Sequence, residues 1–297
     1  MFPGQGSQYV GMGKAAYEAS AKAKEVFALA EEVCRWSVKK LCFEGPLSEL
    51  TRTLHLQPAL TAVSIAVYEA LKERGLEPEI VCGHSLGEYA ALYAAGVLSL
   101  EDTFRLVLKR GELMEKAAKS HPGAMFAVIG LERKKLEEIA AQAQEKGVVA
   151  LANHNAPEQI VITGEEEAVC AAAEAAKEAG ARVVRLKVSG AYHSPLMAEA
   201  AQEFRSFLKG ITFSPPRKRF FSNVTAEEVS SPEEIKHLMG LQIERPVRWV
   251  EEIENIYAAG GREFIEVGPK NVLANLVKKI LKGREFSTCS VENPREF

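Results

Sequence analysis

The segment EIVCGHSLGEYAALYAAG, residues 79–96, decides the fold class of this chain. Its first five residues, EIVCG, form a short apolar run that follows Pro78 and ends at Gly83, which predicts a short buried strand. The run from Leu86 to Gly96 is rich in alanine and leucine, which predicts a helix directly after it. A strand joined to a helix by a tight turn indicates an α/β protein, with Ser85 on the turn.

Ser85 has the sequence surroundings of a nucleophile. In the pattern Gly83-x-Ser85-x-Gly87, small residues permit a strained strand-to-helix turn that exposes the serine hydroxyl. The backbone N–H of Leu86, at the start of the helix, could then stabilise an oxyanion. The pattern by itself is common in loops, and the alternative is an ordinary turn whose serine caps the helix.

A serine nucleophile needs a base, and the sequence has six histidines. His193 is the best candidate, because it follows a predicted strand on a loop made rigid by Gly190 and Pro195. The alternative is a loop histidine with local hydrogen bonds only. His84 adjoins Ser85, but neighbouring side chains on a tight turn usually diverge, so we expect a structural or substrate-contacting role for it. The sequence does not locate a carboxylate that would orient the base.

Arg110 lies on the apolar side of a predicted helix, LEDTFRLVLKRGELMEKAAK, whose N-cap is Ser99. A charge directed toward the core needs an anionic partner, since unpaired burial is very costly. The sequence allows two anionic partners for Arg110: an internal carboxylate in a structural salt bridge, or a substrate carboxylate held by the planar guanidinium fork. The apolar residues three and four positions away on the same face are Leu106, Val107, Leu113 and Met114.

Residues 123–189 form a self-contained pattern of strand, helix, strand, strand, helix and strand. This order is typical of the ferredoxin-like arrangement. We therefore predict a ferredoxin-like subdomain, 121–189, inserted into a larger core formed by 1–120 and 190–297. The core is expected to be α/β-hydrolase-like, with a parallel sheet.

Other core elements follow from periodicity and breaker residues. A helical pattern runs from Ala15 to Trp36, and a second begins near Gln57-Pro58 and continues to Gly75. The run FIEVG at 264–268 predicts a late strand, followed by a helix over NVLANLVKKIL.

Composition excludes several classes of protein. The 297 residues are 47% hydrophobic, with a net charge of −3, and this gives no electrostatic case for binding nucleic acid. The five cysteines are odd in number and scattered, which argues against a zinc site or redox motif and favours a reducing compartment. We see no secretory signal and no run approaching about 18 apolar residues, so we expect a cytoplasmic protein without a membrane segment.

Six motifs occur in one order along the chain, and together they closely resemble the malonyl-CoA:acyl carrier protein transacylases and related acyltransferase domains of polyketide synthases. The resemblance covers essentially the whole chain. The motifs are FPGQGSQ (2–8), GHSLGEYAAL (83–92), RGELM (110–114), GAYHSPLM (190–197), QIERPVRW (242–249) and EVGPKNVL (266–273).

The resemblance implies a ping-pong transfer of malonyl from malonyl-CoA to the phosphopantetheine thiol of acyl carrier protein, for fatty acid biosynthesis, without a metal or redox cofactor. Ser85 would carry the acyl group as an ester, and His193 would be its general base. The remaining implied roles are an oxyanion hole from the Leu86 N–H and Gln5, binding of the malonyl carboxylate by Arg110, and orientation of the histidine by the backbone carbonyl of Gln242.

Two departures from the family pattern bear on these expectations. Family members usually have a short apolar strand before FPGQGSQ, whereas this sequence begins at Met1-Phe2, so we expect weaker anchoring of Gln5. Tyr192 precedes the histidine where phenylalanine is common in malonyl-selective members. Its hydroxyl is expected to bear on which acyl group fits.

Three other functions remain open from the sequence: a polyketide-type acyltransferase using another acyl-CoA, a serine esterase or thioesterase, and a non-catalytic acyl-binding protein. Acyl carrier proteins are acidic as a class, so a basic docking surface is expected. PPRKRF at 215–220, with Lys278 and Lys279, supplies the candidates, although short basic runs are more often simply solvated.

Overall fold

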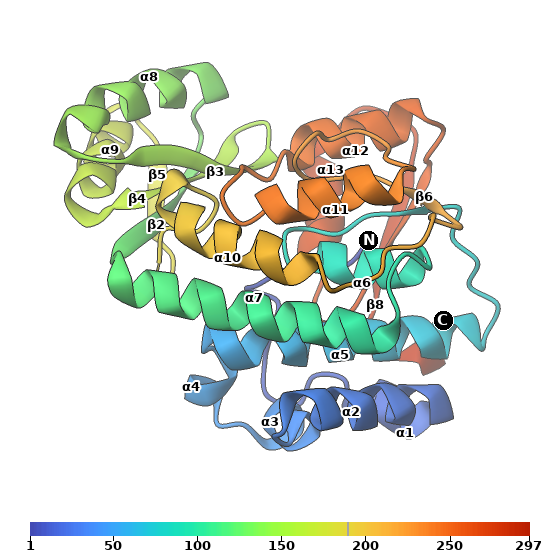
Figure 1. The fold of residues 1–297 in the computed structure, drawn as a ribbon. Helices are drawn as coiled ribbons and strands as arrows, with labels where there is room; N and C mark the ends of the chain where they lie inside the picture. Colours follow the sequence, from blue (N-terminus) through green and yellow to red (C-terminus); the bar gives the residue numbers. More distant parts are fainter. Residues whose placement is uncertain (189) are drawn as a thin grey trace.

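The computed structural model describes residues 1–188 and 190–297, which form a mixed α/β fold (Figure 1). Ser189, where the predicted subdomain ends, lies outside the described residues. Three short 3₁₀ turns are η1 (Gln144–Lys146), η2 (Pro195–Met197) and η3 (Pro294–Glu296). The α-helices are α1 (Lys14–Ala19), α2 (Ala21–Cys34), α3 (Val38–Glu44), α4 (Leu47–Leu50), α5 (Thr53–Lys72), α6 (Gly87–Ala94), α7 (Leu100–Ser120), α8 (Arg133–Ala143), α9 (Glu166–Glu178), α10 (Ala198–Leu208), α11 (Pro232–Leu241), α12 (Trp249–Ala258) and α13 (Val272–Ile280).

Within the described residues, the strands form two small parallel sheets and one antiparallel sheet. β1 pairs with β6 in parallel, β7 pairs with β8 in parallel, and the antiparallel sheet has the order β3-β4-β2-β5. The predicted strands near 79–83 and 264–268 are present as β1 and β7. The strands are β1 (Ile80–Val81), β2 (Gly123–Ile129), β3 (Val149–Ala156), β4 (Gln159–Glu165), β5 (Arg182–Arg185), β6 (Arg219–Phe220), β7 (Glu263–Val267) and β8 (Ser287–Val291).

Helix α5 lies at the centre of the larger core. Every residue from Leu56 to Leu71 is buried, as expected for a helix that is apolar on nearly all sides. It packs against α2 and α7. The predicted start near Gln57-Pro58 is wrong, because the helix begins at Thr53. Proline is frequent at the first position of helices, but here Pro58 lies in the second turn, where it forgoes one backbone hydrogen bond.

The single helix predicted from Ala15 to Trp36 is also wrong, because this segment forms two helices, α1 and α2. Ser20 separates them with an extended backbone, φ −137° and ψ 134°. Its side-chain oxygen accepts a hydrogen bond from the Ala23 N–H, which makes Ser20 the N-cap of α2. A serine in a helical pattern can therefore mark a new helix start.

The antiparallel sheet and two helices form a unit with its own core. Along the chain the order is β2-α8-β3-β4-α9-β5, and α8 and α9 pack on each other and on the sheet. The buried cluster includes Phe126, Leu136 and Ile162. Pro122 forms an isolated antiparallel bridge with Gly190, so the two ends of the unit lie side by side. In Figure 1 the unit lies beyond one end of α7, away from α1–α3.

The parallel strands place the elements that carry the candidate site. β1 leads into α6 and β7 leads toward α13, while α5 and α7 pack alongside α6. Phe2 forms a parallel bridge with Gly83, which fixes the N-terminal segment against the β1–α6 turn. Among the helices of the described residues, none combines the length and hydropathy needed to cross a membrane.

Candidate active site

The turn between β1 and α6 holds Ser85 in a strained conformation. Its φ is 50°, in the left-handed region that non-glycine residues rarely adopt. A Cβ on Gly83 would lie 2.1 Å from the carbonyl carbon of Gly87, and a Cβ on Gly87 would lie 2.0 Å from the Phe2 oxygen. Both positions therefore require glycine. The serine is only partly buried, so its hydroxyl is presented at the tip of the turn.

The hydroxyl of Ser85 lies against the imidazole of His193. Oγ and Nε2 are 2.7 Å apart. Nδ1 of the same ring lies 2.9 Å from the carbonyl oxygen of Gln242 and 3.0 Å from that of Arg245. Because carbonyl oxygens only accept, Nδ1 carries the proton and Nε2 is left to accept one from the serine.

The surroundings of His193 keep its imidazole neutral. Burial, and then the charge of Arg110, lowers the pKa of His193 to about 3. The backbone φ of His193 is 57°, so both the serine and the histidine occupy strained positions. The geometry is that of a nucleophile and its general base.

Arg110 projects from α7 into the same site and is fully buried. Its Nη2 donates to Ser85 Oγ at 3.2 Å and to Gln242 Oε1 at 3.0 Å, and its guanidinium lies 5.6 Å from the Tyr89 ring centre. Nε and Nη1 are buried without a hydrogen-bond partner among the described residues. No carboxylate accepts a hydrogen bond from this guanidinium in that part of the chain, which is unusual for a buried charge.

Gln242, at the end of α11, connects the other groups. Its side-chain Nε2 donates to the Ser85 carbonyl oxygen at 2.8 Å and to a Glu88 carboxylate oxygen. Its Oε1 accepts from Arg110, and its backbone carbonyl accepts from His193 Nδ1. One residue thus holds the serine backbone, the arginine and the histidine in fixed relative positions.

Leu86 and Gln5 lie at the start of α6 and in the N-terminal loop, respectively. Leu86 is the N-cap residue of α6, where backbone N–H groups have no partner within the helix. Gly4 lies against the His84 carbonyl, and the Gln5 side-chain oxygen accepts from Gln57 Nε2 at 3.3 Å. The loop that carries Gln5 is therefore beside the β1–α6 turn.

The description "Acyl transferase domain" belongs to the family model that matches residues 1–292. The chain belongs to this acyl transferase family. Over 296 residues it is 44% identical to the malonyl CoA-acyl carrier protein transacylase of Bacillus subtilis (strain 168), a match that covers 99% of this chain and 93% of the relative.

Solved structures of family members have the same fold. An acyl carrier protein S-malonyltransferase from Vibrio cholerae aligns with a TM-score of 0.94 and 40% identity, covering 98% of this chain and 95% of that chain. A malonyl-transacylase solved in complex with its type II PKS acyl-carrier protein aligns with a TM-score of 0.95 and 38% identity, covering 98% and 94%.

Asn223 holds this acyl transferase's serine turn, and sequence reasoning missed it. Its side-chain oxygen accepts from the Ser85 N–H at 2.6 Å, while its Nδ2 donates to the Gly83 carbonyl at 2.7 Å and to Glu252 at 2.8 Å. Its own N–H donates to Glu88 at 2.8 Å. Asn223 follows β6 in a loop with no charge or spacing signal, so only the three-dimensional contacts reveal it.

Two buried carboxyl groups lie behind the turn and were also missed. Glu88 and Glu252 are both fully buried, and both bond to Asn223. Burial raises the pKa of Glu88 to about 7, and burial together with nearby Glu88 raises the pKa of Glu252 well above its usual value. Their position makes them part of the scaffold of the turn, since neither carboxyl contacts the imidazole of His193.

The remaining predicted residues lie at the margin of the site. His84 Nε2 is 2.7 Å from Asn155 Oδ1 in the antiparallel unit, and its ring packs on Trp249. The Tyr192 hydroxyl lies 2.9 Å from Thr53 Oγ1. In the described part of the chain, no three His, Cys, Asp or Glu side chains are arranged to hold a metal ion.

The low pKa of His193 predicts an unusual pH profile. A base with a depressed pKa stays deprotonated to lower pH, so modification of Ser85 by a neutral sulfonyl fluoride should lose rate only well below pH 6.5. In Arg110→Ala the loss of the positive charge should raise this pKa, while burial still keeps it below 6.5. Stopped-flow or mass-spectrometric rates between pH 4 and 8 measure both; an acid limb at 6.5 in both proteins would contradict the geometry.

Asn223→Ala removes three side-chain hydrogen bonds at the serine turn and leaves the Glu252 carboxyl without its amide donor, while the backbone N–H of residue 223 can still donate to Glu88. We expect a loss of about 2–3 kcal/mol in the free energy of unfolding and a 10–100-fold lower rate of acyl transfer. Urea unfolding and a transfer assay measure the two effects. Asn275→Ala, at an exposed position, is the matched control. Equal effects of the two substitutions would contradict the role of Asn223 in holding the serine turn.

Proposed function

We propose that this protein transfers a malonyl group from malonyl-CoA to the phosphopantetheine thiol of acyl carrier protein, through a Ser85 acyl-enzyme, for fatty acid biosynthesis. The observation that carries the proposal is the buried guanidinium of Arg110, which touches the serine hydroxyl yet has two nitrogens without an acceptor. A carboxylate on the far end of the acyl group supplies that acceptor. The names of the one relative and the two structures described above, each a malonyl transfer enzyme, support the same substrate.

In the first step, Ser85 Oγ attacks the thioester carbonyl carbon while its proton moves to His193 Nε2. The Leu86 N–H and the Gln5 amide stabilise the oxyanion that forms. When the carbon–sulfur bond breaks, the coenzyme A thiolate takes the proton from Nε2. The malonyl group remains as an ester on the serine.

In the second step, the carrier-protein thiol gives its proton to His193 Nε2 and attacks the ester carbonyl. The bond to Ser85 Oγ breaks, and the serine oxygen recovers the proton. Gln242 keeps Nδ1 of the imidazole as a donor throughout, which fixes the tautomer. Each proton and each acyl group is accounted for by the two thiols and the serine, so we propose no cofactor.

Binding of the substrate carboxylate also changes the basicity of the His193 imidazole. The positive charge of Arg110 is one reason that the pKa of His193 is so low. A malonyl carboxylate paired with the guanidinium offsets that charge, so the imidazole becomes a stronger base when the correct acyl group is bound. A neutral acyl group gives no such gain. Arg110 thereby links acyl selection to proton transfer.

The finer description of the fold belongs to the same proposal. We assign residues 1–120 and 190–297 to an α/β-hydrolase-like core and 121–189 to an inserted ferredoxin-like subdomain. The serine turn between β1 and α6 supports the first assignment, and the order β3-β4-β2-β5 with two helices supports the second. We also propose a cytoplasmic location, and we propose neither a membrane nor a nucleic acid as a binding partner.

A polyketide-type transfer is the second candidate, because one structural neighbour is bound to a type II PKS acyl-carrier protein. Its chemistry is the same, and the carrier protein alone distinguishes it. Of the basic docking candidates, Lys218 is paired with Glu77 and Arg219 with Glu228, which leaves them less available to an acidic partner. A serine esterase is the third candidate, and it would release malonate to water.

Mass measurement of the intact protein separates transfer from hydrolysis. With malonyl-CoA alone, the protein should accumulate a single malonyl adduct, and holo acyl carrier protein should remove it and gain the same mass. Ser85→Ala should show neither, whereas exposed Ser206→Ala should behave as the parent protein. Rapid release of free malonate without carrier protein would favour the esterase, and carrier loading by Ser85→Ala would contradict the acyl-enzyme.

Arg110→Ala tests the malonyl carboxylate site. We expect kcat/KM for malonyl transfer to fall by about 10²-fold, since a charge-assisted hydrogen bond is lost, while acetyl transfer is unchanged or faster. Arg105→Ala, on the same helix but paired with Asp102, is the matched control and should leave both rates unchanged. An equal loss of malonyl and acetyl transfer in Arg110→Ala would show that the arginine is structural.

A further inference from the structure

Glu88 lies one helical turn beyond Ser85, and the two steps of the proposed transfer give it no part. It belongs to the first turn of α6, and its N–H donates to the Ser85 carbonyl oxygen at 3.1 Å. Its side chain is fully buried. Burial of a carboxyl group is costly unless donors satisfy its oxygens, so the partners of Glu88 decide what it can do.

Both carboxyl oxygens of Glu88 accept hydrogen bonds from residues far along the chain. Oε1 accepts from the N–H of Asn223 at 2.8 Å, and Oε2 accepts from Nε2 of Gln242. The first turn of a helix adds a field that favours negative charge. Because both partners are donors, the contacts favour the ionised carboxyl group over the protonated one.

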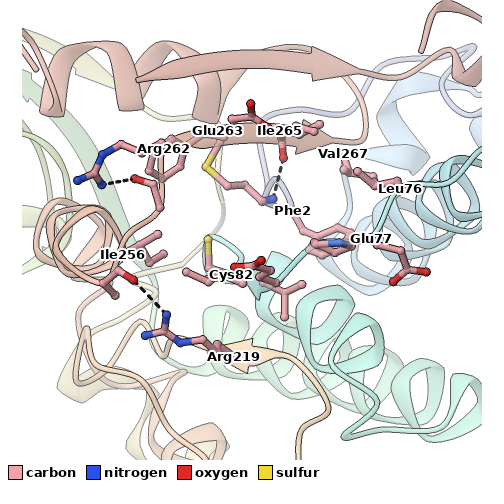
Figure 2. A pocket seen from close by; sticks show the side chains of 18 of the residues that line it. Phe2, Leu76, Glu77, Cys82, Arg219, Ile256, Arg262, Glu263, Ile265 and Val267 are labelled. Atoms are coloured by element: carbon pink, nitrogen blue, oxygen red, sulfur yellow. Dashed lines mark hydrogen bonds between the residues drawn. The ribbon is translucent and has the colours of Figure 1, made fainter. Parts of the chain in front are cut away.

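The charge of Glu88 is balanced by protein groups. Figure 2 shows the cavity of about 550 Å³ between β1 and β7, bordered by Cys82 on one side and Ile265 on the other. The described residues that line this cavity do not include Glu88. Burial raises the pKa of Glu88 to about 7, and its hydrogen bonds together with the charge of Arg110 oppose a further rise.

The Glu88 carboxylate selects the direction in which the Gln242 amide faces. The two hydrogens of Nε2 go to the Ser85 carbonyl oxygen at 2.8 Å and to Glu88. Oε1 then accepts from Nη2 of Arg110 at 3.0 Å. With the amide reversed, its oxygen would face the carboxylate, and its two hydrogens would face the guanidinium. An ionised Glu88 therefore favours the observed direction.

The same hydrogen bonds connect two opposite charges. The carboxylate of Glu88, the amide of Gln242 and the guanidinium of Arg110 follow one another in one row. Burial lowers the pKa of Arg110, and the negative charge of Glu88 is one of the effects that oppose this fall. Glu88 thus helps to keep the guanidinium ionised, with one nitrogen fixed by Gln242 and two others without a protein acceptor.

We propose that Glu88 is a positioning residue for acyl selection: its carboxylate orients the Gln242 amide, which holds the Arg110 guanidinium where it meets a carboxylate on the acyl group. The inference rests on the proposed malonyl transfer and adds to it a residue that acts only through another side chain. A neutral side chain at position 88 carries a hydrogen where the carboxylate has only acceptors. That hydrogen opposes a donor of Gln242 or Asn223, so the row is no longer held.

Glu252 differs from Glu88 in the one contact that matters here. It is also fully buried, and it accepts from Nδ2 of Asn223 at 2.8 Å. Its Oε1 has no hydrogen-bond partner among the described residues, and its contacts do not include Gln242. Burial and the nearby Glu88 raise its pKa well above the usual value. Since Glu88 has more donors, Glu88 is the first of the two to ionise.

Glu88→Gln tests the proposal, and Glu252→Gln is the matched control. Each variant exchanges a buried carboxyl group for an amide of the same size, and melting temperatures show that both are folded. We expect Glu88→Gln to lower kcat/KM for malonyl transfer about tenfold or more, while acetyl transfer changes by less than about threefold. Glu252→Gln should change both rates by the same factor, which leaves their ratio that of the parent protein.

The outcomes separate this inference from the proposed function. Absence of malonyl transfer by the parent protein would contradict the proposed function, and the role of Glu88 with it. Malonyl transfer by the parent, with equal losses of malonyl and acetyl transfer in Glu88→Gln, would overturn the role of Glu88 alone. A lower malonyl-to-acetyl ratio in Glu252→Gln as well would also overturn it, because that carboxyl group does not orient Gln242.

A double-mutant cycle with Arg110→Ala tests whether Glu88 acts through the guanidinium. In the Arg110→Ala background, Glu88→Gln should lower malonyl transfer by less than about twofold, because the group that it positions is already gone. Additive losses in the double variant would show that Glu88 acts on the fold and not on Arg110, and would overturn the proposal.

The pH dependence of the parent protein is a third test, and it needs no variant to fold. Glu88 is ionised above its pKa of about 7 and protonated below it. The ratio of kcat/KM for malonyl to that for acetyl should therefore fall as the pH decreases from about 8.5 to about 6. A constant ratio would overturn the proposal. So would a ratio that rises toward low pH, because repulsion between Glu88 and the acyl carboxylate would then outweigh orientation.

The other titratable groups that interact with Glu88 do not produce the same change. Burial raises the pKa of Cys82 to about 12 and also raises that of Tyr89, so both stay neutral in this range. The guanidinium of Arg110 stays charged. Glu252 ionises only after Glu88, and its amide variant repeats the measurement without it. In Glu88→Gln the ratio should no longer depend on pH.

Discussion

The close approach of three backbone segments is the constraint on which the rest of the site depends. Gly83, Gly87 and the Phe2 carbonyl meet at distances that leave no room for a Cβ. This contact bends the chain between β1 and α6, so Ser85 takes a left-handed conformation and the start of α6 points at its hydroxyl. It also ties the N-terminal segment to the turn. Hydrogen bonds between the backbone of the turn and the side chains of Asn223 and Gln242 hold this strained conformation.

In the proposed function, Arg110 determines which acyl group the serine turn accepts. A serine, a neutral imidazole and an oxyanion site also serve hydrolases, and nothing in them selects an acyl group. The buried guanidinium of Arg110 contacts Ser85 Oγ and has two nitrogens without a hydrogen-bond acceptor. A negative charge is therefore favoured next to this guanidinium. The same cation contributes to the low pKa of His193. In the proposed function, selection of the acyl group and reactivity of the base are therefore coupled through one side chain.

The sequence predicts those parts of the structure that depend on local pattern. The turn at Ser85 and the apolar face that carries Arg110 both follow from periodicity within a few residues. The helix start predicted near Pro58 was wrong, because packing of α5 in the core outweighs the local preference of proline for the first turn of a helix. Asn223 and Glu88 could not be predicted, since they are 135 residues apart and meet only in the folded chain. Family resemblance, more than periodicity, supplied the role expected for Gln242.

A crystal structure of the protein with malonate esterified to Ser85 tests the central claim most directly. The account predicts that the free carboxylate lies within about 2.7–3.0 Å of the Arg110 guanidinium, occupying donors that are otherwise unpartnered. His193 Nδ1 should keep its bond to the Gln242 carbonyl. A carboxylate directed to solvent, with the guanidinium still lacking an acceptor, would contradict the account.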